Sequence, residues 1–176
     1  MYILAGTKKG MRLKVPQEGT RPTTNKIKKS LFDSVQYLIE GAEVLDLFAG
    51  SGSLGLEALS RGARTATFVE KNASAIDCIK KNVEILGFNP QVTIIPSPVE
   101  RALNHLKEYD LIFIDPPYDM NIKTLVQDIR SHLKDGGLMI VEQSKRTKFL
   151  DDLLFNKKKE YGDTVNYFFQ KNDPKI

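Results

Sequence analysis

The stretch Val44-Leu45-Asp46-Leu47-Phe48-Ala49-Gly50-Ser51-Gly52 decides the fold of this chain. In it an apolar run leads through an acidic residue into a glycine turn, and a helix is expected to start near Ser53. Glycines at such a junction allow a sharp turn and let a ligand lie against bare backbone at the helix N-terminus. With Gly55 the segment reads G-x-G-x-x-G, the pattern of dinucleotide-binding folds. A turn that packs helix against strand without any ligand is the alternative interpretation.

Two acidic residues beside the turn narrow the class of ligand. Asp46 stands at the strand end, where its carboxylate would repel a pyrophosphate and favours a positively charged ligand such as S-adenosylmethionine. Glu70 ends the next apolar run, about 20 residues further on, where an acidic side chain can accept hydrogen bonds from both hydroxyls of a ribose. This arrangement is typical of the cofactor site of Rossmann-like methyltransferases.

Outward from the turn, short apolar runs alternate with amphipathic segments of helical period. The expected strands are Val44–Phe48, Thr65–Val69, Val92–Ile95, Leu111–Ile114 and Leu138–Val141. Continuous apolar runs suit strands that are covered on both faces, and the alternation predicts right-handed crossovers onto a parallel sheet. The fold class is therefore α/β with a mostly parallel sheet.

The C-terminal segment breaks this alternation. Lys157–Tyr161 and Thr164–Phe169 have the composition of strands, and only Gly162 and Asp163 separate them. Because two residues cannot form a helical crossover, these strands are expected to run antiparallel to each other. The last strand of the chain should thus be antiparallel to the rest of the sheet.

A second motif, Asp115-Pro116-Pro117-Tyr118, follows the fourth expected strand and so lies at the carboxyl edge of the sheet, where open α/β sheets bind ligands. Two prolines remove two N–H donors, so the Asp115 carboxylate and the Pro116 carbonyl offer only acceptors. Such a pair suits an exocyclic amine with two N–H donors, and Tyr118 supplies a flat face on which a base can stack. A base in a duplex must first be extruded. A purely structural proline turn is the alternative.

Composition limits the other classes of protein. The chain has 176 residues with 41% apolar and 27% charged residues, which suits one core. No stretch is long and apolar enough to span a membrane, and the N-terminus does not resemble a secretory signal. Cys78 and two histidines cannot build a zinc site, so we expect no metal and a location in the cytoplasm.

Charge is distributed unevenly along the chain. Residues 1–30 carry eight basic side chains and one acidic one, whereas the rest of the chain carries 18 basic and 21 acidic ones. Residues 1–22 are expected to form an arm with two short strands, at 2–5 and 11–15, followed by a helix and a single domain over 23–176. A basic block of this kind is typical of a surface that binds a polyanion, most often nucleic acid. A solvated basic face is the alternative.

The motifs together carry a family resemblance. The combination of Asp115–Tyr118 with Asp46–Gly52 is similar to the amino-methyltransferases that act on nucleic-acid bases. Over essentially its whole length the chain resembles the RsmD-type family of bacterial 16S ribosomal RNA guanine-N2 methyltransferases. The matching segments are Gly6, Lys9-Gly10, Thr20–Thr23, Ser30–Phe32, Asp46–Gly52, Leu54–Ala58, Asp115–Tyr118 and Tyr161–Thr164.

The resemblance implies a Rossmann-like class I methyltransferase fold with a seven-stranded sheet, and methyl transfer from S-adenosylmethionine to guanine N2. It implies catalytic roles for Asp115, Pro116 and Tyr118. The expected cofactor-binding residues are Asp46, Phe48, Gly50, Gly52, Glu70, Lys71, Ser97 and Val99. The expected RNA contacts are Lys8, Lys9, Arg12, Lys14 and Arg21. The implied partner is 16S ribosomal RNA, in the small subunit or its assembly intermediate, and the protein is expected to act as a monomer without a membrane partner.

The chain departs from the family pattern in three places. Met11 replaces an arginine, Lys29 replaces a glutamate, and Ser97-Pro98 stands where an acceptor for the adenine amine is usual. A DNA adenine-N6 or cytosine-N4 methyltransferase could use the same acceptor pair, although 176 residues leave little room for a target-recognition region. A nicotinamide-dependent oxidoreductase would have no use for Asp115–Tyr118, and a non-catalytic RNA-binding module would not need them.

Overall fold

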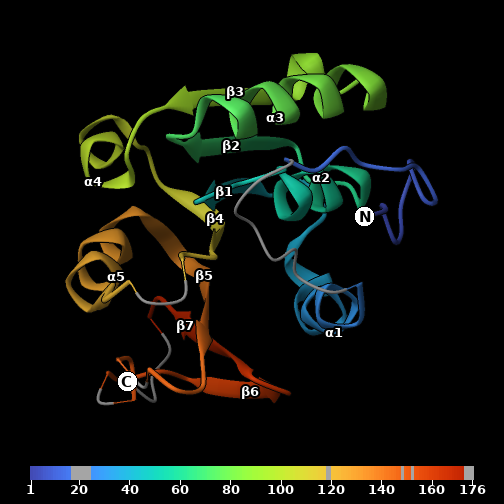
Figure 1. Ribbon diagram of the computed structural model, residues 1–176. Coiled ribbons are helices and arrows are strands. Elements are labelled where there is room, and N and C mark those ends of the chain that lie inside the picture. Colours follow the sequence, from blue (N-terminus) through green and yellow to red (C-terminus); the bar gives the residue numbers. More distant parts are fainter. Residues whose placement is uncertain (17–24, 118–119, 148, 152, 173–176) are drawn as a thin grey trace.

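A computed structural model describes residues 1–16, 25–117, 120–147, 149–151 and 153–172. Its centre is a seven-stranded sheet with the order β3-β2-β1-β4-β5-β7-β6 (Figure 1). The strands are β1 (Glu43–Leu47), β2 (Thr65–Glu70), β3 (Val92–Pro96), β4 (Tyr109–Ile114), β5 (Leu133–Ser144), β6 (Lys157–Tyr161) and β7 (Thr164–Gln170). All five predicted parallel strands are confirmed, and β1 and β4 are almost wholly buried because both faces of the sheet are covered.

Helices cover the two faces of the sheet in separate layers. On one face lie α1 (Asn25–Val35), α2 (Ser53–Ser60) and α3 (Ala73–Leu86), which share a core cluster with residues such as Phe68 and Phe113. On the other face lie α4 (Val99–Ala102) and α5 (Lys123–Ile129), as Figure 1 shows to the left of the strands. Short 3-10 helices occupy Gln36–Leu38, Asn89–Gln91, Leu103–His105 and Arg130–His132. None of the helices in the described ranges could cross a membrane.

The antiparallel last strand is confirmed, and its place in the sheet adds a detail. β7 lies between β5 and β6 and is antiparallel to both, so β6 forms the edge. Gly162 adopts a left-handed φ of 54°, which the tight turn from β6 to β7 requires. β5 is much longer than predicted, because it starts at Leu133 and continues through polar residues as far as Ser144.

The N-terminal arm (residues 1–16) differs from the predicted pair of strands. Tyr2 and Arg12 form a single antiparallel bridge, and Ile3 N donates to the Met11 carbonyl at 3.0 Å. The ladder ends there because the next two backbone N–H groups, of Leu4 and Ala5, donate to the Glu57 carboxylate of α2 at 2.8 and 3.0 Å. The predicted hairpin is therefore confirmed, but its paired part is shorter than residues 2–5 and 11–15, since a buried side chain of α2 takes the place of a partner strand from Leu4 onward.

The arm also contributes to the core, because Ile3 and Leu13 are buried in the cluster under α1, α2 and α3. The predicted division into an arm of residues 1–22 and a domain of 23–176 stays a prediction, and residues 17–22 lie outside the described ranges.

Candidate active site

The glycine turn joins β1 to α2 as the sequence predicts, and the Asp46 side chain is hydrogen-bonded to the start of α2. Asp46 is buried, and its Oδ2 accepts a hydrogen bond from the Gly55 N–H at 2.9 Å. A Cβ on Gly55 would lie 2.4 Å from the Phe68 ring, so only glycine allows this close approach of α2 to the sheet. The carboxylate thus ties the first turn of α2 to the end of β1.

The backbone of the turn is held in unusual conformations. Phe48 has a φ of 57°, one of the positive values found for non-glycine residues in the described ranges, and Gly50 and Gly52 have φ of 54° and 75°. A left-handed phenylalanine stores conformational strain of about 1–3 kcal/mol, which the surrounding structure must hold in place. Such strain is concentrated at functional sites, and here it falls on a residue that the sequence assigns to cofactor binding.

Glu70 lies at the end of β2, where its carboxylate connects three backbone segments. Its Oε2 accepts from the Gly50 N–H at 2.9 Å, and its Oε1 accepts from the N–H groups of Lys71 and Asn72 at 2.8 Å each. Asn72 in turn caps α3 by accepting from the Ala75 N–H. Glu70 is only half-buried, so a carboxylate oriented by backbone donors faces the edge where a ribose would lie.

The remaining predicted cofactor residues lie along the same edge. The Lys71 side chain is exposed. The Ser97 N–H donates to the Glu70 carbonyl at 3.0 Å, and the Ser97 hydroxyl donates to the Pro98 carbonyl at 3.1 Å. Val99 begins α4 and its side chain is buried in the core cluster on the α4–α5 face. Ser97 is therefore beside Glu70, whereas Val99 has only its backbone to offer a ligand.

Asp115 and Pro116 follow β4 at the carboxyl edge, and both are half-exposed. The Asp115 N–H donates to the Leu47 carbonyl at 3.5 Å, which places this turn beside the end of β1. Tyr118 lies outside the described residues. The first two residues of the motif are thus brought next to the glycine turn, as the sequence predicts.

The electrostatics of this edge are those of crowded carboxylates. Burial raises the pKa of Asp46 well above its usual range, the Gly55 N–H opposes that shift, and the negative charges of Asp115 and Glu70 add to it. Burial, reinforced by Asp115, also raises the pKa of Glu142 on β5 to about 8. Negative charge at this edge therefore favours a cationic ligand.

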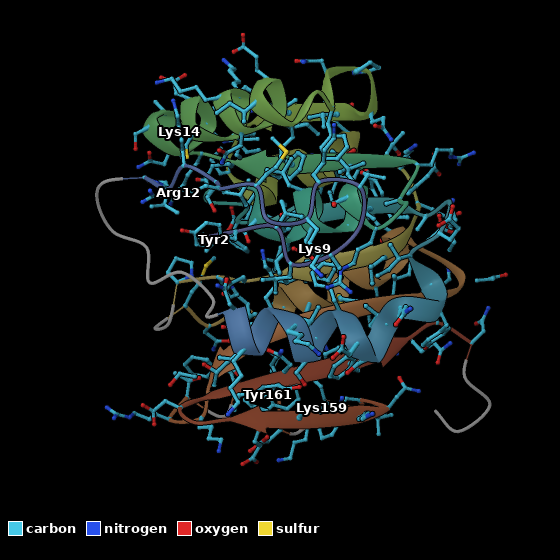
Figure 2. The ribbon with its side chains drawn as sticks, turned by 90° about the vertical axis from the view of Figure 1, so that its right-hand side faces the viewer. Tyr2, Lys9, Arg12, Lys14, Lys159 and Tyr161 are labelled. Atoms are coloured by element: carbon cyan, nitrogen blue, oxygen red, sulfur yellow. The ribbon has the colours of Figure 1, made fainter. Side chains whose placement is uncertain are left out.

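The basic residues of the arm lie along α2 and α3, and Lys8 is at the edge opposite the site, where its N–H donates to the Ser60 hydroxyl at the end of α2. Lys9, Arg12 and Lys14 are exposed along the arm, which passes over α2 and α3 in Figure 2. The Lys8 ammonium lies 5.6 Å from the centre of the Phe88 ring. Arg21 lies outside the described residues.

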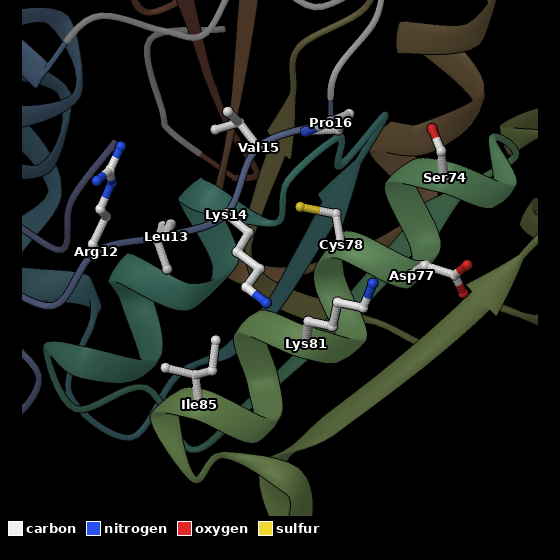
Figure 3. Close-up of a pocket in the computed structure, with 10 residues that line it drawn as sticks. All are labelled: Arg12, Leu13, Lys14, Val15, Pro16, Ser74, Asp77, Cys78, Lys81 and Ile85. Atoms are coloured by element: carbon white, nitrogen blue, oxygen red, sulfur yellow. The ribbon is translucent and has the colours of Figure 1, made fainter.

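A cavity of about 740 Å³ lies between the arm and α3 (Figure 3). Its lining includes Arg12 and Lys14 from the arm and Asp77, Cys78 and Lys81 from α3. The basic block of the sequence thus forms one wall of a groove that leads toward the start of α3.

Sequence reasoning missed the buried polar residues that fix the arm. Lys28 and Glu57 form an ion pair at 3.2 Å with both side chains fully buried, and Lys28 also donates to the Tyr2 carbonyl. Asn82 on α3 accepts from the Lys14 N–H and donates to the carbonyls of Lys14 and Ser51. In a sequence these residues look like ordinary helix positions, so no local signal could have found them.

Within the described ranges no group of three or more His, Cys, Asp or Glu side chains could hold a metal ion. The described site consists of three features at one edge of the sheet. These are the glycine turn, the carboxylates of Asp46, Glu70 and Asp115, and the proline turn that offers only acceptors. These features, on this strand order, define a Rossmann-like class I methyltransferase fold.

Comparison with known proteins gives the family. The model of the family described as Conserved hypothetical protein 95 matches residues 1–170, and the chain belongs to this family. YlbH of Bacillus subtilis, described as a candidate ribosomal RNA methyltransferase, is 35% identical over 97% of this chain and 99% of its own length. The ribosomal RNA small subunit methyltransferase D of Haemophilus influenzae is 35% identical over 81% of this chain and 78% of its own. The RsmD-type resemblance is thus confirmed.

A solved structure agrees with these relatives. The Escherichia coli protein yhhF, described as a candidate methyltransferase, matches 97% of each chain with 29% identity and a TM-score of 0.85. The similarity therefore includes the N-terminal arm as well as the sheet.

Proposed function

We propose that this chain transfers a methyl group from S-adenosylmethionine to the exocyclic N2 amine of a guanine in 16S ribosomal RNA. The observation that carries the proposal is the position of the acceptor-only turn at Asp115 and Pro116 beside the glycine turn and Glu70. The names of the small-subunit methyltransferase D relatives support ribosomal RNA as the substrate. We further propose that the protein acts in the cytoplasm, as a monomer, on the small subunit or its assembly intermediate.

The residues at the edge fit S-adenosylmethionine. Gly50 and Gly52 leave bare backbone beside the methionine position, and Glu70 presents an oriented carboxylate for the ribose hydroxyls. The raised pKa of Asp46 reflects burial first and the neighbouring charges of Asp115 and Glu70 next, and a cationic ligand would offset those charges. When bound, the cofactor supplies an electrophilic methyl group next to a positive sulfonium.

The proposed chemistry places the reacting amine on Asp115 and Pro116. The lone pair of an exocyclic amine is delocalised into its base, which makes the amine a weak nucleophile. Two acceptors that hold both N–H groups turn the lone pair out of the plane of the base and toward the cofactor. The amine loses a proton after the methyl group has transferred, so the chain needs no strong base. Tyr118 is proposed to stack on the base.

RNA is proposed to approach along the basic arm. The side chains of Lys8, Lys9, Arg12, Lys14 and Arg21 would contact phosphates and set the register of the strand, without reading its sequence. The groove between the arm and α3 offers such a path, because the arm and α3 both supply cations to its walls.

The test is methyl transfer from labelled cofactor to small ribosomal subunits that lack the modification, followed by identification of the methylated nucleoside. We expect N2-methylguanosine, and we expect duplex DNA to remain unlabelled. N6-methyladenine or N4-methylcytosine as the product would instead support the alternative DNA-type amino-methyltransferase. Binding of NAD rather than S-adenosylmethionine in calorimetry would overturn the proposed class of enzyme.

A further inference from the structure

A row of polar side chains crosses the sheet beyond the proposed amine site. The parallel register that pairs Ile114 with Val141 brings the next residues, Asp115 and Glu142, to one level. The antiparallel register pairs Glu142 with Asn166. Asp115, one residue beyond β4, is therefore level with Glu142 on β5 and Asn166 on β7, and by strand alternation their side chains point to the same face of the sheet.

The two inner members of this row, Glu142 and Asn166, are buried and carry polar atoms without a hydrogen-bond partner in the described part of the chain. Glu142 is 7% exposed and Asn166 is fully buried. Glu142 Oε2 and both polar atoms of the Asn166 amide have no hydrogen-bond partner among the described residues. Buried polar groups are normally paired, because each unpaired group costs about 1–3 kcal/mol. Such a row in a native protein points to a ligand that completes it.

Two residues before the polar row, the same strands carry a row of apolar side chains. Phe113, Ile140 and Phe168 lie on the same three strands and the same face, and they pack in the core under α1. On the far side the row ends at Lys159 of β6, which is paired with Asn166 and donates to the Ser34 hydroxyl of α1 (Figure 2). Glu142 and Asn166 thus lie just beyond the hydrophobic cluster on this face of the sheet.

The order of groups along the row matches the Watson–Crick edge of guanine. That edge presents the N2 amine, the N1–H and O6, which are donor, donor and acceptor in sequence. Asp115 and Glu142 offer carboxylate acceptors, and Asn166 offers an amide donor. Adenine and cytosine instead carry a ring-nitrogen acceptor next to the reacting amine, and it would face the Glu142 carboxylate.

We propose that Glu142 selects guanine by accepting its N1–H beside the amine held at Asp115, with the Asn166 amide donating to O6. This inference rests on the proposed function. Neighbouring strands lie about 4.8 Å apart, so Glu142 is the next side chain along the sheet from Asp115, on the side away from Glu70. The raised pKa of Glu142 fits a carboxyl that lacks its donor, and the N1–H would supply one.

The test compares guanosine with 2-aminopurine ribonucleoside at the methylated position of 16S RNA reconstituted into small subunits. 2-Aminopurine keeps the exocyclic amine, but its N1 is an acceptor and it lacks O6. At pH 9, where the Glu142 carboxyl is ionised and can only accept, we expect wild type to prefer guanosine in kcat/KM by about a thousandfold, because a site built to bind a donor rejects an analogue without it. In Glu142→Gln the amide can rotate to donate to N1, so we expect the preference to fall by about a hundredfold.

Gln143→Met is the matched control. Gln143 is the next residue on β5 and is also buried, its amide has no hydrogen-bond partner within the described ranges, and it points to the opposite face. The preference of this variant for guanosine should stay within about twofold of wild type. Thermal unfolding of each variant verifies the fold, and Glu142→Gln is nearly isosteric.

Two results would overturn this inference alone. One is a wild-type enzyme that forms N2-methylguanosine yet methylates 2-aminopurine within about tenfold as well. The other is a folded Glu142→Gln enzyme that keeps the wild-type preference. A wild-type product other than N2-methylguanosine would overturn the proposed function, and the inference with it.

Discussion

The two halves of the sheet edge treat their polar side chains in opposite ways. On β1 and β2, Asp46 and Glu70 are held by backbone N–H groups: Gly55 of α2 donates to Asp46, and Gly50 of the glycine turn and Lys71 before α3 donate to Glu70. On β5 and β7, Glu142 and Asn166 are buried with polar atoms that lack partners among the described residues. The first half is thus organised before any ligand binds, whereas in our proposal the second half is completed by the target base. The cofactor site binds the same ligand in every turnover, whereas the proposed base site must distinguish guanine from the other bases.

The largest effect is expected where the two halves meet. Asp115→Ala removes one acceptor for the reacting amine, and we expect the methylation rate to fall by about a hundredfold or more, as for loss of one preorganised electrostatic partner. Cofactor affinity should be nearly unchanged, since Glu70 and the glycine turn remain. Single-turnover rates together with calorimetric cofactor binding measure the two quantities. A near-normal rate would remove Asp115 from the chemistry.

The second prediction concerns how buried Glu142 changes the stability of the ligand-free protein with pH. Because burial raises the pKa of Glu142 to about 8, the folded protein keeps its proton in a range where the unfolded chain loses it. Stability due to this group therefore falls as pH rises from about 4.5 to about 8. Relative to wild type, Glu142→Gln should gain on the order of 2–3 kcal/mol between pH 5 and pH 7.5.

Denaturant unfolding of the cofactor-free proteins at several pH values measures this difference. Gln143→Met again serves as the control, and its stability relative to wild type should not depend on pH in this way. A stability difference between Glu142→Gln and wild type that does not vary with pH would show that the carboxyl is already ionised in the fold.

The third prediction concerns the organised half. Glu70→Ala should weaken S-adenosylmethionine binding by about 1.5–3 kcal/mol, because it removes a charge-assisted hydrogen bond to the ribose and the tie to Gly50. Calorimetry gives the affinity, and Glu84→Ala, at an exposed position of α3, is the control. An affinity equal to that of wild type would exclude Glu70 from the site.

The same contrast explains what could be predicted from sequence. The glycine turn, Glu70 and the turn at Asp115 are local motifs next to strand ends, and parallel strands bring their carboxyl ends to one edge. Glu142 and Asn166 are different, because within β5 and β7 they look like ordinary polar positions of a strand. Only the register of β4, β5 and β7 places them beside Asp115.

The arm shows the same limit. Its alternating apolar residues predict a hairpin, and the buried ones do reach the core. The backbone donors of Leu4 and Ala5, however, go to Glu57, which is more than fifty positions away in the chain. A hydrogen bond between the backbone and a carboxylate so distant in the chain gives no local sequence pattern. The sequence therefore could not predict that the strand pairing would stop at Ile3.

The smallest effect per residue is expected on the arm, where basic side chains would hold RNA without touching the chemistry. The arm is fixed to the body through its backbone, by Glu57 at Leu4 and Ala5 and by Asn82 at Lys14. Neutralising Lys8, Lys9, Arg12 and Lys14 to glutamine should therefore spare the fold and cofactor binding while weakening RNA binding.

Salt dependence separates true phosphate binding from a merely solvated basic face. Removing one cation that pairs with a phosphate should flatten the slope of log affinity against log salt by about 0.7–0.9, so removing four such cations should change the slope by about three. Neutralising Arg64 and Lys107 gives the control, because both pair with Glu43 at the start of β1, on the edge opposite the site. RNA-binding isotherms at several salt concentrations decide the question. Parallel lines for wild type and the four-fold variant would mean that the arm does not bind phosphate, and RNA would then have to reach Asp115 by another face of the protein.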